Sequence, residues 1–130
     1  MEDAFRQYLW KNFGAAIDML KEAITLCPDE LWQKEMKFFY LTCHTTIFLD
    51  YYLTYPVKNF QPGLPYTVTD PDKLPPEAID DVIPDRHYSR QEILAGLSSI
   101  REKCKKLILH TTGDKLMNRW IEDDEISMHG

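Results

Sequence analysis

Hydrophobic residues near the start of the chain recur at intervals of three and four positions, which is the period of an α-helix. The pattern covers residues 4–26 and places six apolar side chains on one face: Phe5, Leu9, Phe13, Ala16, Leu20 and Ile24. Cys27-Pro28 follows, and a residue that precedes a proline is disfavoured in the helical region of backbone space. We therefore predict an amphipathic helix over residues 4–26 that buries this face.

The segment 34–55 has apolar residues on most sides instead of on a single stripe, which is typical of a central, heavily packed helix. One row along it holds Leu41, His44, Phe48, Tyr51 and Tyr55. His44 is thus a lone imidazole midway along a largely apolar helix. The segment also contains Asp50 and four threonines, and a carboxylate is costly inside a bilayer. We predict a buried helix here and no membrane span.

The helical period disappears over residues 56–88, which contain seven of the eight prolines. Connections within helical bundles usually have about 2–8 residues, so a connection of this length needs a reason. A short loop makes neighbouring helices antiparallel, whereas a long crossover allows two consecutive helices to run in the same direction. We predict a crossover over residues 56–88 and parallel helices on either side of it.

The third helix has the clearest start signal, because Ser89 and Glu92 have the spacing of a capping box. Its apolar seam follows at steps of four and three: Ile93, Leu97, Ile100, Cys104 and Leu107. His110 closes the last turn, where a cation suits the helix dipole, and Gly113 is a suitable stop. We expect one further short helix over residues 114–120.

Composition agrees with one globular domain over residues 1–130, with 44% hydrophobic and 28% charged residues. Fifteen basic against 21 acidic side chains give a net charge of −6, which disfavours nucleic acids and anionic membranes as partners. The one basic cluster, residues 101–106, lies late in the third helix, and we interpret it as a solvated helix end.

Three cysteines, an odd number without a C-x-x-C pair, disfavour a disulfide scaffold and fit a reducing compartment. The acidic start of the chain leads directly into the first helix, so we expect no signal peptide. Together these features predict a soluble, cytoplasmic, all-α protein.

Several motifs resemble the DinB-like (DinB/YfiT) family of four-helix bundles. They are YLW at 8–10, DML at 18–20, CPDELW at 27–32, and LTCHTTIFLDYYL at 41–53, together with the proline-rich crossover before residues 88–90. The resemblance covers essentially the whole chain and is strongest around His44. It implies an up-down-down-up bundle, which agrees with the parallel second and third helices inferred above.

The resemblance also implies a metal site. Members of the family typically hold a divalent metal, of the Zn or Ni type, on three histidines, and His44 corresponds to the one in the second helix. The other two commonly form an H-x-x-x-H pair in the fourth helix. Some relatives are metal-dependent thiol transferases or isomerases, in which the metal acts as a Lewis acid on a thiol or water. The family name records induction by DNA damage and implies no contact with DNA.

This chain departs from that pattern, since it has no H-x-x-x-H pair and no sequence for a fourth helix. His129 does not match a ligand position of the family. We therefore expect a domain that is incomplete at its C-terminus, either a piece of a longer protein or a truncated relative, with an incomplete metal site.

Each candidate residue also has a structural interpretation. His44 is either a metal ligand or a core histidine hydrogen-bonded to a tyrosine or a backbone carbonyl. Cys43 lies about 100° around the helix from His44, so a core thiol is favoured over a Cys–His nucleophile. Tyr40 and Tyr51 are favoured as core residues, and His87 is expected to face solvent. The sequence has no phosphate-binding loop, Ser-His-Asp order or nucleotide fingerprint.

Two functions follow from these observations. The first is a DinB-like protein related to metal-dependent thiol transferases or hydrolases, with His44 as the remaining ligand. The second is a non-catalytic helical interaction module, because three helices built for a four-helix core leave an apolar groove open. A homodimer would close that groove.

Overall fold

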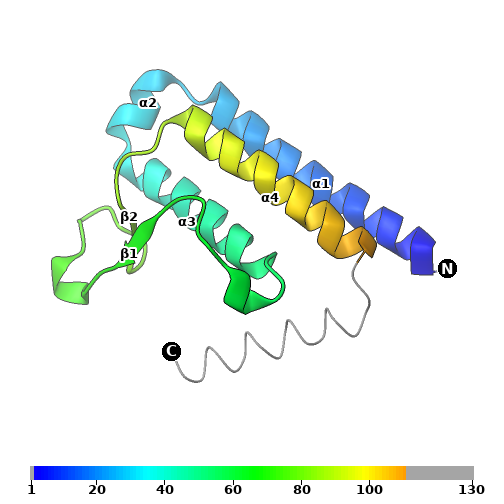
Figure 1. Cartoon of the computed structure of the whole chain (residues 1–130). Helices are drawn as coiled ribbons and strands as arrows, with labels where there is room; N and C mark the ends of the chain where they lie inside the picture. Colours follow the sequence, from blue (N-terminus) through cyan, green and yellow to red (C-terminus); the bar gives the residue numbers. More distant parts are fainter. Residues whose placement is uncertain (1, 111–130) are drawn as a thin grey trace.

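The computed structural model of the chain describes residues 2–110, which are mostly helical, as the sequence predicts (Figure 1). The helices in this part are α1 (Glu2–Leu26), α2 (Asp29–Lys34), α3 (Met36–Tyr52) and α4 (Arg90–His110). The crossover between α3 and α4 contains the short helices η1 (Val57–Asn59) and η2 (Pro71–Lys73) and the strands β1 (Tyr66–Val68) and β2 (Val82–Pro84). The predicted stop at Gly113, the predicted short helix at 114–120 and His129 lie outside the described residues.

Helices α1 and α4 lie side by side and run in opposite directions (Figure 1). Near the start of α1, Arg6 Nη1 donates to the carbonyl of Ile108 at 3.0 Å. At the other end of the pair, Arg90 of α4 donates to the carbonyl of Cys27, which directly follows α1. The pair is therefore tied at both ends.

The basic cluster contributes to this pairing, and its interpretation as a solvated helix end was wrong for two of its members. Arg101 of α4 donates two hydrogen bonds to the carboxylate of Asp18 on α1, at 2.8 and 3.0 Å. Its guanidinium also lies 4.8 Å from the centroid of the Trp10 ring. Lys103 points to α3 instead and pairs with Asp50. The cluster thus joins α4 to both neighbouring helices.

Helices α3 and α4 run in the same direction, which confirms the inference from the long crossover (Figure 1). At their starts, the ring of Phe39 in α3 stacks on His87, just before α4, with centroids 4.2 Å apart. At their ends, Lys103 of α4 reaches Asp50 of α3. The start of α3 thus contacts the start of α4, and the end of α3 contacts the second half of α4, as in parallel helices.

The predicted capping box and seam of α4 are confirmed. Ser89 Oγ accepts a hydrogen bond from the Glu92 backbone N–H at 3.1 Å, and the Glu92 carboxylate accepts one from the Ser89 N–H at 3.4 Å. The buried residues of the helix are Ile93, Leu97, Ile100, Cys104 and Ile108. The last member of the seam is thus Ile108, whereas the expected Leu107 is only half-buried.

The predicted face of α1 is only partly buried. Phe5 and Phe13 are 65% and 44% exposed, whereas Ile17 and Ile24 are the large side chains that the core covers. The reason is that α4 is the main partner of α1 and covers a strip to one side of the predicted stripe. The prediction of a heavily packed α3 holds only in part, because Phe39, Cys43 and Ile47 are buried whereas Leu41 is 52% exposed.

The sequence did not predict α2 or the two strands. Trp32 fixes α2, since its side chain is buried and its Nε1–H donates to the carbonyl of Tyr88 at 3.1 Å. β1 and β2 form an antiparallel pair with Thr67 opposite Ile83. Elements of three to six residues are too short to show a period, which explains why the pattern missed them. No helix within residues 2–110 is long and apolar enough to cross a membrane.

Candidate functional site

His44 lies in the middle of α3, but on its half-open side and not in the core. Its side chain is 35% exposed, and its Nδ1 lies 2.6 Å from Oδ2 of Asp80. The partner is therefore a carboxylate, and neither a tyrosine nor a backbone carbonyl. Phe48, one turn along the helix, packs on the imidazole with ring centroids 4.6 Å apart. The ring is held on one side by this contact and on another by Asp80.

Asp80 comes from the crossover, two residues before β2. While Oδ2 contacts His44, Oδ1 accepts a hydrogen bond from the backbone N–H of Val82 at 3.1 Å. Because both oxygens are engaged, the carboxylate is fixed in orientation. An ionised carboxylate at Nδ1 favours the tautomer with its proton on Nδ1, which leaves the lone pair on Nε2. Such an imidazole is prepared to bind a metal ion or to accept a proton.

The described residues do not fit a complete metal centre. A zinc site takes three or four protein ligands, and within residues 2–110 no three His, Cys, Asp or Glu side chains lie together in a group that could hold an ion. This part of the chain therefore supplies one ligating imidazole with its orienting carboxylate. The sequence identified His44, but nothing in the pattern of residues 56–88 distinguished Asp80 from the other acidic residues there.

Cys43 precedes His44 and has a different environment. Its side chain is fully buried, and burial raises the pKa of the thiol to about 12. A thiol that stays protonated at neutral pH is a poor nucleophile and a poor metal ligand. The prediction of a core thiol is thus confirmed. All three cysteines of the chain are free and buried, which agrees with the absence of a disulfide scaffold.

The remaining candidates are structural. Tyr40 is half-buried against the core, and burial raises the pKa of its hydroxyl. Tyr51 packs edge-on against Phe60, with centroids 5.2 Å apart. His87 was expected to face solvent, and this was wrong, because it stacks on Phe39 and its Nε2 lies 3.2 Å from the carbonyl oxygen of Trp32. The unpredicted α2 accounts for this, since it brings Trp32 against the residues before α4.

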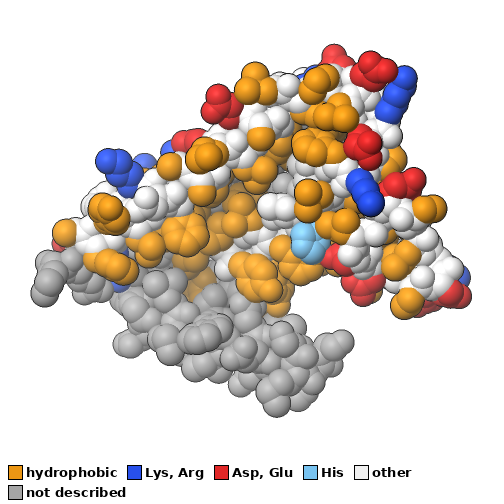
Figure 2. Space-filling view, turned by 180° about the vertical axis from the view of Figure 1, so that it is seen from behind, with side chains coloured by type: hydrophobic (Ala, Val, Ile, Leu, Met, Phe, Trp, Pro, Cys, Tyr) orange, Lys and Arg blue, Asp and Glu red, His pale blue; other side chains and the backbone are white. Residues whose placement is uncertain are grey.

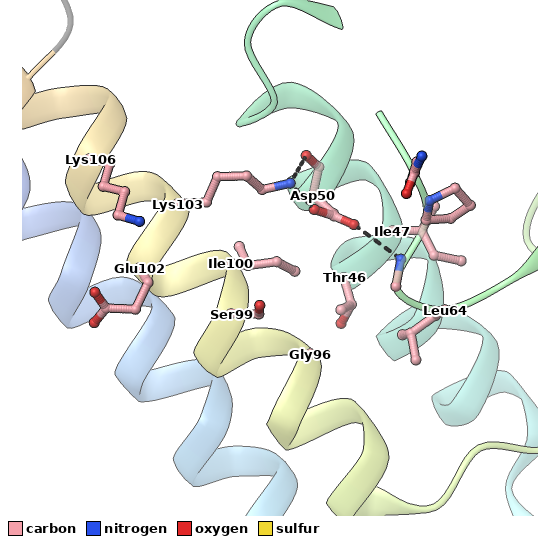
Figure 3. Close-up of a pocket in the computed structure, with 13 residues that line it drawn as sticks. Thr46, Ile47, Asp50, Leu64, Gly96, Ser99, Ile100, Glu102, Lys103 and Lys106 are labelled. Carbon is pink, nitrogen blue, oxygen red and sulfur yellow. Dashed lines mark hydrogen bonds and ion pairs between the residues drawn. The ribbon is translucent and has the colours of Figure 1, made fainter. Parts of the chain in front are cut away.

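A second polar cluster lies between α3 and α4 (Figure 3). The ammonium of Lys103 contacts the carboxylate of Asp50 and lies 3.2 Å from the Asp50 carbonyl and 2.7 Å from Thr54 Oγ1. The other carboxylate oxygen accepts from the Gly63 N–H at 3.4 Å. The sequence could have indicated this pair, because a carboxylate on a buried helix needs a cation and the basic cluster at residues 101–106 supplies one.

Comparison of the chain with protein-family models, curated proteins and solved structures finds no match. The resemblance to the DinB-like family therefore stays a prediction from the sequence. The features that bear on function are the geometry around His44 and the surfaces that the three long helices leave exposed.

Proposed function

We propose that this chain is a DinB-like helical domain in which His44 binds a divalent metal ion, within a protein related to metal-dependent thiol transferases or hydrolases. The observation that carries the proposal is the 2.6 Å contact between His44 Nδ1 and Asp80 Oδ2. Histidines that bind metals almost always donate their second ring nitrogen to a carboxylate, a carbonyl or water. The opposite direction of α1 and the shared direction of α3 and α4 also agree with the bundle of that family (Figure 1).

The proposal assigns one ligand to this part of the chain. The exposed fraction of His44 leaves its ring accessible to an ion and to donors from elsewhere. Cys43 is excluded as a second ligand, because its thiol is buried and protonated. The further ligands therefore come from outside residues 2–110 or from another chain.

Titration of the full chain with Ni²⁺ tests the proposal, with binding followed by NMR of the histidine side chains. We expect the His44 ring signals to shift first, and His44→Ala to remove the tightest site. Asp80→Asn should weaken binding by about tenfold, since loss of an orienting partner typically costs 10–100-fold in affinity. His110→Ala, at the exposed end of α4, is the matched control and should bind like the native chain.

Two results would count against this function. One is equal affinity for Ni²⁺ in the native chain and in His44→Ala. The other is unchanged binding in Asp80→Asn, which would show that the carboxylate does not orient the ring. Metal content after purification gives a second measure, and it should fall in His44→Ala and not in His110→Ala.

A specific observation also favours the second candidate, an interaction module that forms a homodimer. Large apolar side chains are exposed on α1, including Phe5, Tyr8 and Met19, and on α3 Leu41 and Tyr52 are exposed. Figure 2 shows hydrophobic side chains along α1 and in the hollow beside it. Apolar side chains that gather on an exposed surface often mark association sites in soluble proteins.

Light scattering over a range of protein concentrations tests the dimer. We expect Phe5→Ser together with Leu41→Ser to shift the mass toward the monomer. Val68→Ser, an exposed apolar residue on β1, is the control and should leave the mass unchanged. A native chain that stays monomeric at every concentration would contradict this candidate.

A further inference from the structure

A pocket of about 380 Å³ lies between α3, α4 and the loop 61–64 (Figure 3). Ile47 of α3, Leu64 of the loop and Ile100 of α4 supply its apolar walls, and His44 does not line it. Its size falls within the range of about 300–1,000 Å³ that is usual for small-molecule sites. The pocket is thus separate from the site proposed above, and it is large enough for a small organic ligand.

Gly96 opens one wall of this pocket. A glycine inside a helix lowers the stability of the helix relative to alanine, so its presence within α4 needs a reason. Packing does not supply one, because a Cβ on Gly96 would meet no heavy atom within 4 Å. Gly14 of α1 differs, since a Cβ there would meet Trp10 at 3.2 Å and Arg101 at 3.3 Å. Gly14 allows two helices to approach, whereas Gly96 leaves a space that no side chain within residues 2–110 fills.

Two hydroxyl groups line the same pocket. Ser99 lies one turn after Gly96 and is exposed, and its hydroxyl makes no hydrogen bond within the described part of the chain. Thr46 donates its hydroxyl to the carbonyl of Thr42 at 2.8 Å. A hydroxyl that donates one bond still has acceptor capacity, and that of Ser99 can donate or accept. The pocket therefore offers polar contacts beside its apolar walls.

Four charged side chains line the pocket: Asp50, Glu102, Lys103 and Lys106. Asp50 and Lys103 neutralise each other, and the contacts of Lys103 to Asp50 and Thr54 use its three N–H groups. Figure 3 shows the Glu102 side chain directed away from α3. Lys106 also lines the pocket and makes no ion pair within residues 2–110. An anionic group at this edge would meet the ammonium of Lys106.

We propose that this pocket binds a small aliphatic carboxylate. Its hydrocarbon chain lies over Gly96 between Ile47 and Ile100, and its carboxylate pairs with Lys106 at the edge. The hydroxyl of Ser99 donates a hydrogen bond to the same carboxylate. Apolar walls with a few convergent polar groups are the usual construction of a small-molecule site.

Octanoate is a suitable test ligand, followed by amide chemical shifts of the ¹⁵N-labelled full chain. We expect the signals of Gly63, Gly96 and Ser99 to shift at up to about 10 mM octanoate, since a single short chain and one charge support millimolar affinity. Gly96→Leu fills the space and should abolish these shifts. Its melting temperature should be at least that of the native chain, because a helical glycine is replaced. Gly96→Ala leaves most of the volume open and should still bind.

The charge is tested separately. Lys106→Gln should weaken octanoate binding by about two- to fivefold, which is the range for an exposed ion pair. Lys105→Gln, whose ammonium lies 5.9 Å from the Trp10 ring on the other side of α4, is the matched control and should not change it. The proposal is overturned if native chain shows no shifts at Gly96, if Gly96→Leu binds as well as the native chain, or if octanol binds as tightly as octanoate.

Discussion

The two sides of α3 differ in how far they are exposed to water. Cys43 and His44 are adjacent in sequence, yet the thiol is fully buried and the imidazole is about one-third exposed. Each side also has a carboxylate paired with a nitrogen-bearing side chain. Asp50, which is 13% exposed, pairs with Lys103 of α4, while His44 pairs with Asp80 of the crossover. The same helix thus has a closed side and a half-open side.

The partners explain the difference. The closed side faces α4, a long helix with a continuous apolar seam, so groups there lose most of their water. A charge in such a place must be paired, because desolvation of an unpaired ion is costly. The half-open side faces a crossover whose strands have only three residues each, so the imidazole keeps part of its hydration. Stability therefore depends mainly on the closed side, and the accessible imidazole of His44 lies on the half-open side.

Replacing Lys103 by Met should produce the largest effect. The carboxylate of Asp50 would stay mostly buried without its cation, so the free energy of unfolding should fall by about 2–4 kcal/mol in urea titrations. The double variant Asp50→Asn, Lys103→Met removes the stranded charge and should recover at least half of the loss. A fall below about 0.5 kcal/mol in the single variant would show that the closed side is more hydrated than its burial indicates.

Alkaline pH should act on the closed side through Cys43. Burial raises the pKa of this thiol from its ordinary 9.0 to about 12 in the folded chain. The thiol therefore does not affect the pH dependence of stability below pH 9. The free energy of unfolding decreases as the pH rises from 9 toward 12, because the thiol of the unfolded chain ionises first. The free energy of unfolding should fall between pH 8 and pH 11 in both the native chain and Cys43→Ala. The fall should be smaller by about 1–2 kcal/mol in Cys43→Ala than in the native chain. Parallel pH profiles would contradict this.

On the half-open side, Asp80→Asn should change stability by less than about 1 kcal/mol, since both members of the pair are partly solvated. The tautomer is the more sensitive measure. Nitrogen chemical shifts of the His44 ring should show loss of the Nδ1–H preference in the variant, with no such change in Asp81→Asn as the control. A large loss of stability in Asp80→Asn would mean that the crossover closes this side more firmly than the exposure of the pair suggests.

The smallest effect is expected at the surface pair between α1 and α4. Hydrogen bonds from Arg101 hold the pKa of the Asp18 carboxyl below its usual 3.8. Because the pKa is lower in the folded chain, the pair stabilises the fold fully above the ordinary pKa of 3.8. This stabilisation is lost as the pH falls through the lowered pKa of the folded chain. Arg101→Gln should return the pKa, measured by carboxyl ¹³C shifts, to its ordinary range. Lys21→Gln should move it less, since its influence on Asp18 is weaker.

Sequence periodicity predicted the three long helices, because each has several turns of repeating apolar positions. The capping box at Ser89 and Glu92 was predictable for a different reason, since it is a local contact between residues three positions apart. Trp32 and Asp80 were not predictable. Their roles depend on Tyr88 and His44, which lie 56 and 36 positions away in the chain, and no local pattern encodes those contacts.

By itself, the sequence determined that the chain is mostly helical and that α3 and α4 are joined by a long crossover. It also indicated that Cys43 is a core residue and that His44 is the main candidate for a functional side chain. These properties depend on period, spacing and composition, which are local. Only the tertiary structure decided which face of α1 is buried, which carboxylate meets His44, and that Gly96 borders an open pocket. Those properties depend on where a distant element packs, and packing decides how much water each side chain keeps.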